Sequence, residues 1–120
     1  MSPVQRPLSG SPLSFRLEEE LRTVRAQLAD GSRSARTLVK NGPLRATLIG
    51  LAPGGSLASH SADGPITVHV LDGAIEFEAE GSRWPLPVGT LFSLDAGVVH
   101  AVHAPQGGIF LLTMAAPPAE

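Results

Sequence analysis

The fold is decided by residues 66–79, which read ITVHVLDGAIEFEA. Asp72-Gly73 lies between two alternating runs and favours a two-residue type I′ turn, because both central positions of that turn need a positive φ. The pattern predicts a hairpin in which Leu71 faces Ala74. One face of this hairpin collects the apolar residues Ile66, Val68, Val70, Ile75, Phe77 and Ala79, which we expect to point inward. The other face carries Thr67, His69, Glu76 and Glu78, with His69 opposite Glu76.

Short runs rich in β-branched residues or leucine continue on both sides of this hairpin. They cover residues 36–40, 44–51, 66–71, 74–79, 90–94, 98–103 and 108–114, and turn-forming residues separate them. Closely spaced strands of this kind are typical of a β-sandwich or barrel. We therefore predict an all-β fold in which residues 36–116 form a closed antiparallel barrel.

The first 35 residues have a different pattern. Residues 1–12 are rich in Pro, Ser and Gly, which predicts an extended arm. The next segment, 14–29, lacks Pro and Gly, and its apolar residues recur at helical spacing at Leu17, Leu21, Val24 and Leu28. We predict one amphipathic helix over 14–29, with Ser14 as its N-cap and Gly31 as its stop. Its apolar face is expected to pack on its own domain or on a second subunit.

Composition narrows the classes of function. The chain has 120 residues, enough for one compact domain, and no cysteine, which excludes disulfides, thiolate metal ligands and a cysteine nucleophile. A net charge of −2, with one Trp and no Tyr, offers little to a nucleic acid. No apolar run approaches the roughly 20 residues that cross a bilayer. We expect a soluble, cytoplasmic protein with neither a nucleic acid nor a membrane as its partner.

Two motifs combine glycine and histidine at fixed spacing. The first runs from Gly54 to Gly73 and contains His60. The second consists of Gly89, Gly97 and His100. Each motif alone carries little information, but the two together are fairly specific.

With these motifs, the chain from Leu38 to Met114 resembles a small single-domain cupin of the RmlC-like superfamily. The resemblance implies a jelly-roll-like, double-stranded β-helix barrel with a pocket at one end, where intact members hold a divalent metal on three histidines and one glutamate. The matching positions keep His60 and His100, whereas Ala62 and Ile66 replace the other two ligands. In the second motif a proline and an asparagine are replaced by Asp95 and Ala104. The resemblance also implies a homodimer, because cupins commonly pair through sheet edges.

These substitutions favour a non-catalytic cupin that binds or senses a small organic ligand. The predicted ligand pocket is lined by His60, His100, Ile66, Val68 and Phe77. We expect His60 and His100 to be polar anchors in an otherwise apolar pocket. No catalytic residue and no tightly bound cofactor are predicted.

The alternative is a metal-dependent enzyme of the isomerase or dioxygenase type. It would bind Fe, Mn, Zn or Ni on His60 and His100, with Asp63 or water completing the site. The other two histidines have structural explanations. His69 would form an ion pair with Glu76, and His103 would point away from His100 on the same strand.

Overall fold

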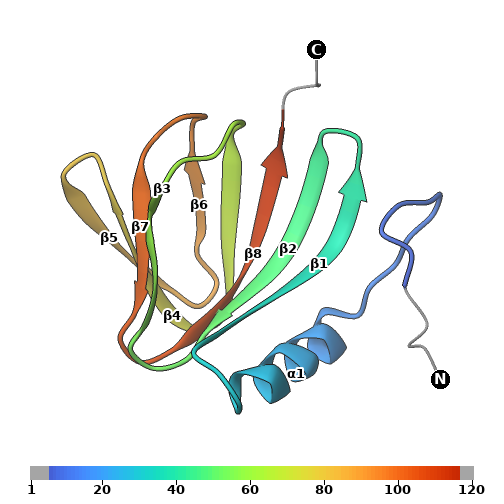
Figure 1. The fold of residues 1–120 in the computed structure, drawn as a ribbon, viewed down its shortest axis with the longest axis horizontal. Coiled ribbons are helices and arrows are strands. Elements are labelled where there is room, and N and C mark those ends of the chain that lie inside the picture. The colour runs from blue at the N-terminus through green and yellow to red at the C-terminus, as the bar shows by residue number, and fades with distance from the viewer. Residues whose placement is uncertain (1–5, 117–120) are drawn as a thin grey trace.

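The structure is a computed structural model, and it describes residues 6–116. This part of the chain folds into one helix and eight strands that curl around a common interior (Figure 1). The elements are α1 (Leu17–Leu28), β1 (Arg33–Asn41), β2 (Leu44–Leu51), β3 (Gly55–His60), β4 (Ile66–Ala79), β5 (Ser82–Pro87), β6 (Leu91–Leu94), β7 (His100–Ala104) and β8 (Gly108–Ala115). All strand pairings among the described residues are antiparallel. The predicted all-β class is confirmed, and the first strand starts three residues before the expected position 36.

The strands form two sheets that share β4. The order in the first sheet is β1-β2-β8-β4-β6, and the order in the second is β3-β7-β4-β5. The first half of β4 pairs with β6 and β8, and its second half pairs with β5 and β7. The hydrogen-bonded path of the described strands ends at β1 and β3, without a ladder between those two strands. The barrel predicted as closed is therefore an antiparallel sheet that curls into a barrel shape.

The hairpin predicted at Asp72-Gly73 is wrong, because β4 runs through this dipeptide without turning. Gly73 has a φ of 65°, but Asp72 is not among the positive-φ residues, so a type I′ turn is absent. The glycine is needed for another reason: a Cβ there would lie 2.4 Å from the backbone oxygen of Gly107. A β-bulge between Val70 and Asp72 adds the extra residue that switches the buried face from even to odd positions.

The tight hairpin lies instead at Glu80-Gly81, between β4 and β5. Glu80 has a φ of 52° and Gly81 a φ of 74°, and Ala79 pairs directly with Ser82 across the two-residue loop. Positive φ at both positions fits a type I′ turn. The inward set of β4 is nevertheless the predicted one, and its six members Ile66, Val68, Val70, Ile75, Phe77 and Ala79 are all buried.

Two strands, β3 and β5, were not predicted from the sequence. In β3 the burial pattern alternates only at the start. Half of its residues are polar, namely Ser56, Ser59 and His60, so the strand has no clear apolar face. In β5 the two prolines Pro85 and Pro87 argue against a strand. Both strands lie on the outer edges of the second sheet, where such residues are tolerated.

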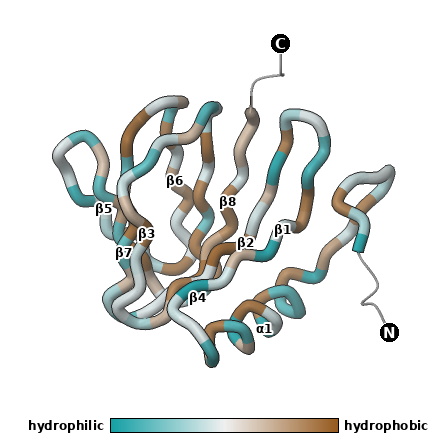
Figure 2. Tube along the Cα trace, viewed as in Figure 1, coloured by the Kyte–Doolittle hydropathy of each residue, from teal (hydrophilic) through white to brown (hydrophobic). Residues whose placement is uncertain are grey.

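The helix covers the outer face of the first sheet. Its apolar residues Leu21 and Val24 pack on Leu38, Leu48 and Ile109, separately from the core inside the curl. Hydrophobic and hydrophilic residues alternate along α1 and along the strands (Figure 2). A Cβ at Gly50 would lie 2.5 Å from a methyl carbon of Val24, so this glycine permits the close approach of the helix.

The ends of the helix differ from the prediction. Helix α1 begins at Leu17, with Arg16 rather than Ser14 at the N-cap and without a side-chain capping bond. It ends at Leu28, with Ala29 rather than Gly31 at the C-cap. The acidic first turn and the packing of the helix on β1 and β2 stabilise it without these caps.

The described part of the segment before the helix, from Arg6 onward, is hydrogen-bonded to the first sheet. The backbone N–H of Lys40 in β1 donates to the carbonyl of Leu8 at 2.8 Å. Glu20, which is only 8% exposed, accepts hydrogen bonds from both Arg6 and Arg36. The predicted arm over 1–12 is therefore anchored from Arg6 onward, and residues 1–5 lie outside the described residues.

Two glycines with similar φ angles distinguish the cost of backbone strain from the cost of a steric clash with a neighbouring strand. Gly42 (φ 57°) has no atom within 4 Å of an added Cβ, whereas at Gly73 (φ 65°) that Cβ would meet Gly107 and Gly108. We expect Gly42→Ala to lower the free energy of unfolding by about 1 kcal/mol from backbone strain alone. Gly73→Ala should cost at least about 3 kcal/mol, because the backbone of β8 must move as well. Equal losses for both variants, measured by denaturant unfolding, would contradict the role assigned to Gly73.

A substitution at Val68 tests whether the predicted apolar face of β4 points inward. Its side chain is fully buried, so Val68→Asp places a carboxylate without partners in the core and should lower the free energy of unfolding by more than about 4 kcal/mol. Thr67→Asp is the matched control, because Thr67 is exposed on the same strand, and it should cost under about 1 kcal/mol. A Val68→Asp variant that melts like the parent protein would refute the inward assignment.

Candidate functional site

His60 and His100 meet at one end of the barrel. His60 is the last residue of β3 and His100 is the first of β7, and the two are direct partners across these strands. A register shift between Leu57 and His60 brings the two histidines opposite each other. Their ring centroids are 4.4 Å apart at an interplanar angle of 60°. His100 is 4% exposed, whereas His60 is open to solvent.

Both imidazoles are oriented by the same type of contact. Nδ1 of His60 lies 2.8 Å from the carbonyl oxygen of Ala58, and Nδ1 of His100 lies 2.9 Å from that of Val98. A carbonyl oxygen only accepts hydrogen bonds, so Nδ1 must carry the proton in both rings. In the neutral form, each ring then keeps a lone pair on Nε2, which can accept a hydrogen bond or bind a metal.

An array of aromatic rings continues from the histidine pair. Phe77 stacks on His100 with centroids 5.5 Å apart, and Phe92 lies 5.2 Å from Phe77. Trp84 follows at 5.8 Å from Phe92 and is 48% exposed. The array therefore links the buried histidine to the surface of the protein.

A cavity of about 420 Å³ lies beside this array. It is lined by Ala79, Glu80, Trp84, Phe92, Ser93, Leu94, Asp95 and Val98. Two of these residues touch the histidine pair, because Ala79 is the strand partner of His100 and Val98 accepts the hydrogen bond from its Nδ1. We call this space the mouth cavity.

Three of the predicted pocket residues pair directly with residues of the mouth cavity. Ile66, Val68 and Phe77 are at most 3% exposed and belong to the core. Their direct strand partners are the cavity residues Leu94, Phe92 and Trp84, respectively. Contact between a ligand and Ile66, Val68 or Phe77 stays a prediction.

Sequence reasoning missed Trp84, Phe92 and Leu94 as cavity residues. The signal that could have found them is the spacing of two in Trp84-x-Leu86 and Phe92-x-Leu94. The prolines of β5 hid this spacing in one strand, and the run predicted over 90–94 did not by itself show which way Phe92 and Leu94 face.

The predicted pair of His69 and Glu76 is wrong, because it depended on the hairpin that does not form. His69 lies opposite Leu91 and Leu111, and Glu76 accepts a hydrogen bond from Arg83 at 3.0 Å. The histidine with a carboxylate partner is His103, whose Nε2 lies 3.2 Å from Glu78. As expected from its odd spacing, His103 lies on the outer face, away from the buried His100.

Ala62 and Asp63 of the first motif do not complete a metal site with the two histidines. Ala62 is packed against the core, and its carbonyl accepts a hydrogen bond from the N–H of Gly97. Asp63 is exposed on the segment that joins β3 to β4. Within residues 6–116, no group of three or more His, Cys, Asp or Glu side chains is placed to hold a metal ion.

A family model, described as "Cupin domain", matches residues 47–114 of this chain. The match covers more than half of the sequence and includes both histidines of the site. The chain belongs to the cupin domain family. No curated protein matches it in sequence.

Solved structures resemble this cupin over most of its length. A conserved protein of unknown function from Streptococcus pyogenes is 29% identical, with 72% of this chain and 76% of that chain covered and a TM-score of 0.68. An RmlC-like cupin from Shewanella frigidimarina is 26% identical, with 75% and 79% covered and a TM-score of 0.67. A salicylate 1,2-dioxygenase variant from Pseudoaminobacter salicylatoxidans shares the fold, with a TM-score of 0.77 at 20% identity. This cupin spans 95% of its own length but only 40% of that enzyme's.

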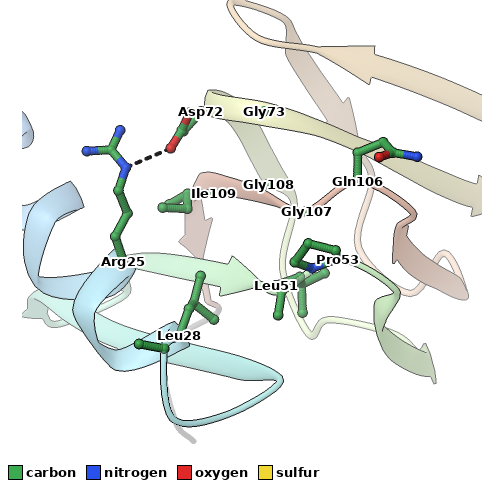
Figure 3. Close-up of a pocket in the computed structure, with 12 residues that line it drawn as sticks. Arg25, Leu28, Leu51, Pro53, Asp72, Gly73, Gln106, Gly107, Gly108 and Ile109 are labelled. Carbon is green, nitrogen blue, oxygen red and sulfur yellow. Dashed lines mark hydrogen bonds and ion pairs between the residues drawn. The ribbon is translucent and has the colours of Figure 1, made fainter.

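A second cavity, of about 340 Å³, lies at the opposite end of β3 and β7 (Figure 3). Arg25 Nε of α1 donates to Asp72 Oδ2 at 2.8 Å along its rim, and Leu28, Leu51 and Ile109 form its apolar wall. Close backbone contacts account for its glycines: Gly73 and Gly108 lie where β4 meets β8, and Gly107 lies against Pro53. No helix of the described residues is long and apolar enough to cross a membrane.

Burial lowers the pKa of His100 below its ordinary value of 6.5. The hydrogen bond to the Val98 carbonyl acts in the opposite direction, and the nearby His60 lowers the pKa further. His100 is therefore neutral at pH 7, and its Nε2 is an acceptor.

This lowered pKa predicts a pH-dependent stability. Between the lowered pKa and 6.5 the unfolded chain binds more protons than the folded chain, so the free energy of unfolding falls as the pH drops through this window. His100→Asn should reduce that fall, whereas His103→Asn, which removes an outer histidine, should retain the part due to His100. Thermal unfolding from about pH 8 to about pH 5 measures the difference between the variants. A His100→Asn variant that loses as much stability at low pH as the parent would contradict the assignment.

Proposed function

We propose that this cupin is a non-catalytic module that binds or senses a small organic ligand at the mouth of the barrel. The observation that carries the proposal is the histidine pair, whose Nδ1 atoms are fixed by backbone carbonyls and whose neighbours Ala79 and Val98 line a partly aromatic cavity. Pockets that combine apolar walls with a few oriented polar groups are typical of small-molecule sites. His60 and His100 are the polar anchors of this site.

The chemistry of the anchors selects the ligand. In its neutral form each imidazole accepts through Nε2, so the ligand presents a hydrogen-bond donor to the pair. The rings of Phe92 and Trp84 then cover an apolar or aromatic body of the ligand.

The same donor set argues against a tightly bound catalytic metal. Catalytic zinc and facial-triad iron sites use three protein ligands, whereas the site supplies two imidazoles. Ala62 and Ile66 carry only alkyl groups at the positions where the family's other ligands belong, and Ile66 is 3% exposed in the core. Metal-dependent isomerase or dioxygenase chemistry on His60, His100 and Asp63 is the competing function.

Phenol and anisole test the anchors directly. They have similar rings, but only phenol has an O–H to donate. We expect phenol to bind more tightly than anisole in ligand-observed NMR titrations. His60→Ala or His100→Asn should weaken phenol binding about fivefold, which corresponds to one hydrogen bond of about 1 kcal/mol. His69→Ala, which removes a histidine from another part of the barrel, is the matched control and should bind phenol normally.

Elemental analysis separates the two functions. Untagged protein, dialysed against a mild chelator, should retain far less than one equivalent of Fe, Mn, Zn or Ni. Near-stoichiometric metal that disappears in both His60→Ala and His100→Asn would overturn the binding-module proposal in favour of an enzyme. Equal binding of phenol and anisole would show that the histidines do not anchor the ligand.

A further inference from the structure

We propose that the mouth cavity recognises a small organic cation, an ammonium group on a flat apolar body, through the rings of Trp84 and Phe92 and the carboxylates of Glu80 and Asp95. The inference rests on the proposed binding function and adds the charge of the ligand to it. It depends on three properties of the cavity: its aromatic wall, its uncompensated negative charge and its lack of a cationic side chain.

The aromatic wall is formed where β5 and β6 flank β4. Trp84 and Phe92 are tilted by 47° to each other, with centroids 5.8 Å apart, and both line the cavity. Phe92 is backed by Phe77, which holds it in place, whereas Trp84 is half exposed and keeps a surface for a ligand to cover. Indole and phenyl faces attract cations, and tryptophan does so most strongly.

The charged groups of the cavity are all acidic. Glu80 and Asp95 line it, and neither forms an ion pair within residues 6–116. Glu80 is fixed by the positive-φ hairpin, and it also lines a hollow of about 280 Å³ together with His100. Asp95 begins the turn that leads to Val98 and the histidine.

No Lys or Arg lines the mouth cavity. The neighbour of Trp84 along the chain, Arg83, bonds Glu76 on the outer face of the barrel instead. An anion would therefore meet two carboxylates without a counter-charge, whereas an ammonium group meets two carboxylates and two aromatic faces. The charge pattern selects a cation over a carboxylate or a neutral alcohol of the same size.

Trp84 is the only tryptophan of the chain, so its fluorescence reports directly on the cavity. We would titrate the full-length protein at neutral pH with 2-phenylethylamine, 2-phenylethanol and 3-phenylpropanoate. These probes share a phenyl ring and a short spacer but carry a positive, a neutral and a negative end. The amine should bind at least about fivefold more tightly than the alcohol, and the propanoate should bind most weakly. Raising the salt concentration should weaken the amine alone, because screening removes the attraction to the carboxylates.

Three variants locate the charge selectivity. Glu80→Gln and Asp95→Asn each remove one negative charge from the cavity, and each should reduce the preference for the amine over the alcohol two- to fivefold. Glu18→Gln removes the same charge from the exposed face of α1 and is the matched control, with an expected preference equal to the parent's. Circular dichroism of each variant checks that it is folded. If Glu80→Gln does not fold, Asp95→Asn alone decides the outcome.

The outcomes separate this inference from the proposed function. Equal binding of the amine and the alcohol, or a preference that survives both cavity variants, overturns the cation site and leaves the phenol test of His60 and His100 standing. Amine binding that depends on Glu80 and Asp95 but is unchanged in His60→Ala and His100→Asn supports the cation site and overturns the histidine anchors. An amine that gives no saturable change in Trp84 fluorescence refutes the cation site.

Discussion

The structure depends on β4 being a member of both sheets. Its first half lies between β6 and β8 and its second half between β5 and β7, so four strands take their register from one continuous backbone. The bulge after Val70 lets this strand bury Val68 in one half and Phe77 in the other. Without the extra residue, one half would turn its valines or its phenylalanine to solvent. Both walls of the mouth cavity are paired to β4, one through β5 and the other through β6, so the site inherits its geometry from the same strand.

The sequence could predict which residues of β4 are buried, because the alternation of apolar and polar side chains determines the inner face whatever the topology. It could not distinguish a tight turn from a bulge at Asp72-Gly73, since both shift the alternation by one position. The difference is decided by Gly107 and Gly108, which come into contact with Gly73 only after β8 is in place. A hairpin at Glu80-Gly81 has a weaker local signal than one at Asp-Gly, so local turn chemistry alone favoured the wrong position.

The candidate site, too, could be predicted from the sequence only in part. The spacing of the two motifs was sufficient to identify His60 and His100, and the structure brings their rings together. The walls beside them come from β5 and β6. The prolines of β5 hid that strand, and the predicted run over 90–94 did not by itself show that Phe92 lines a cavity. The predicted residues Ile66, Val68 and Phe77 are buried strand partners of cavity residues, and their contact with a ligand stays a prediction.

The two prolines of β5 also change the free edge of this strand. Proline has no N–H, so the ladder with β4 must use the donors of the residues between them, such as Leu86, and Pro85 and Pro87 occupy positions whose backbone nitrogens face away from β4. The free edge of β5 therefore lacks two of the N–H donors that an added strand would use. An exposed edge next to a half-exposed tryptophan is a common starting point for aggregation, and the two missing donors make this edge a poorer template. The barrel can therefore keep an apolar, accessible ring at its mouth while the adjacent strand offers fewer donors for uncontrolled assembly.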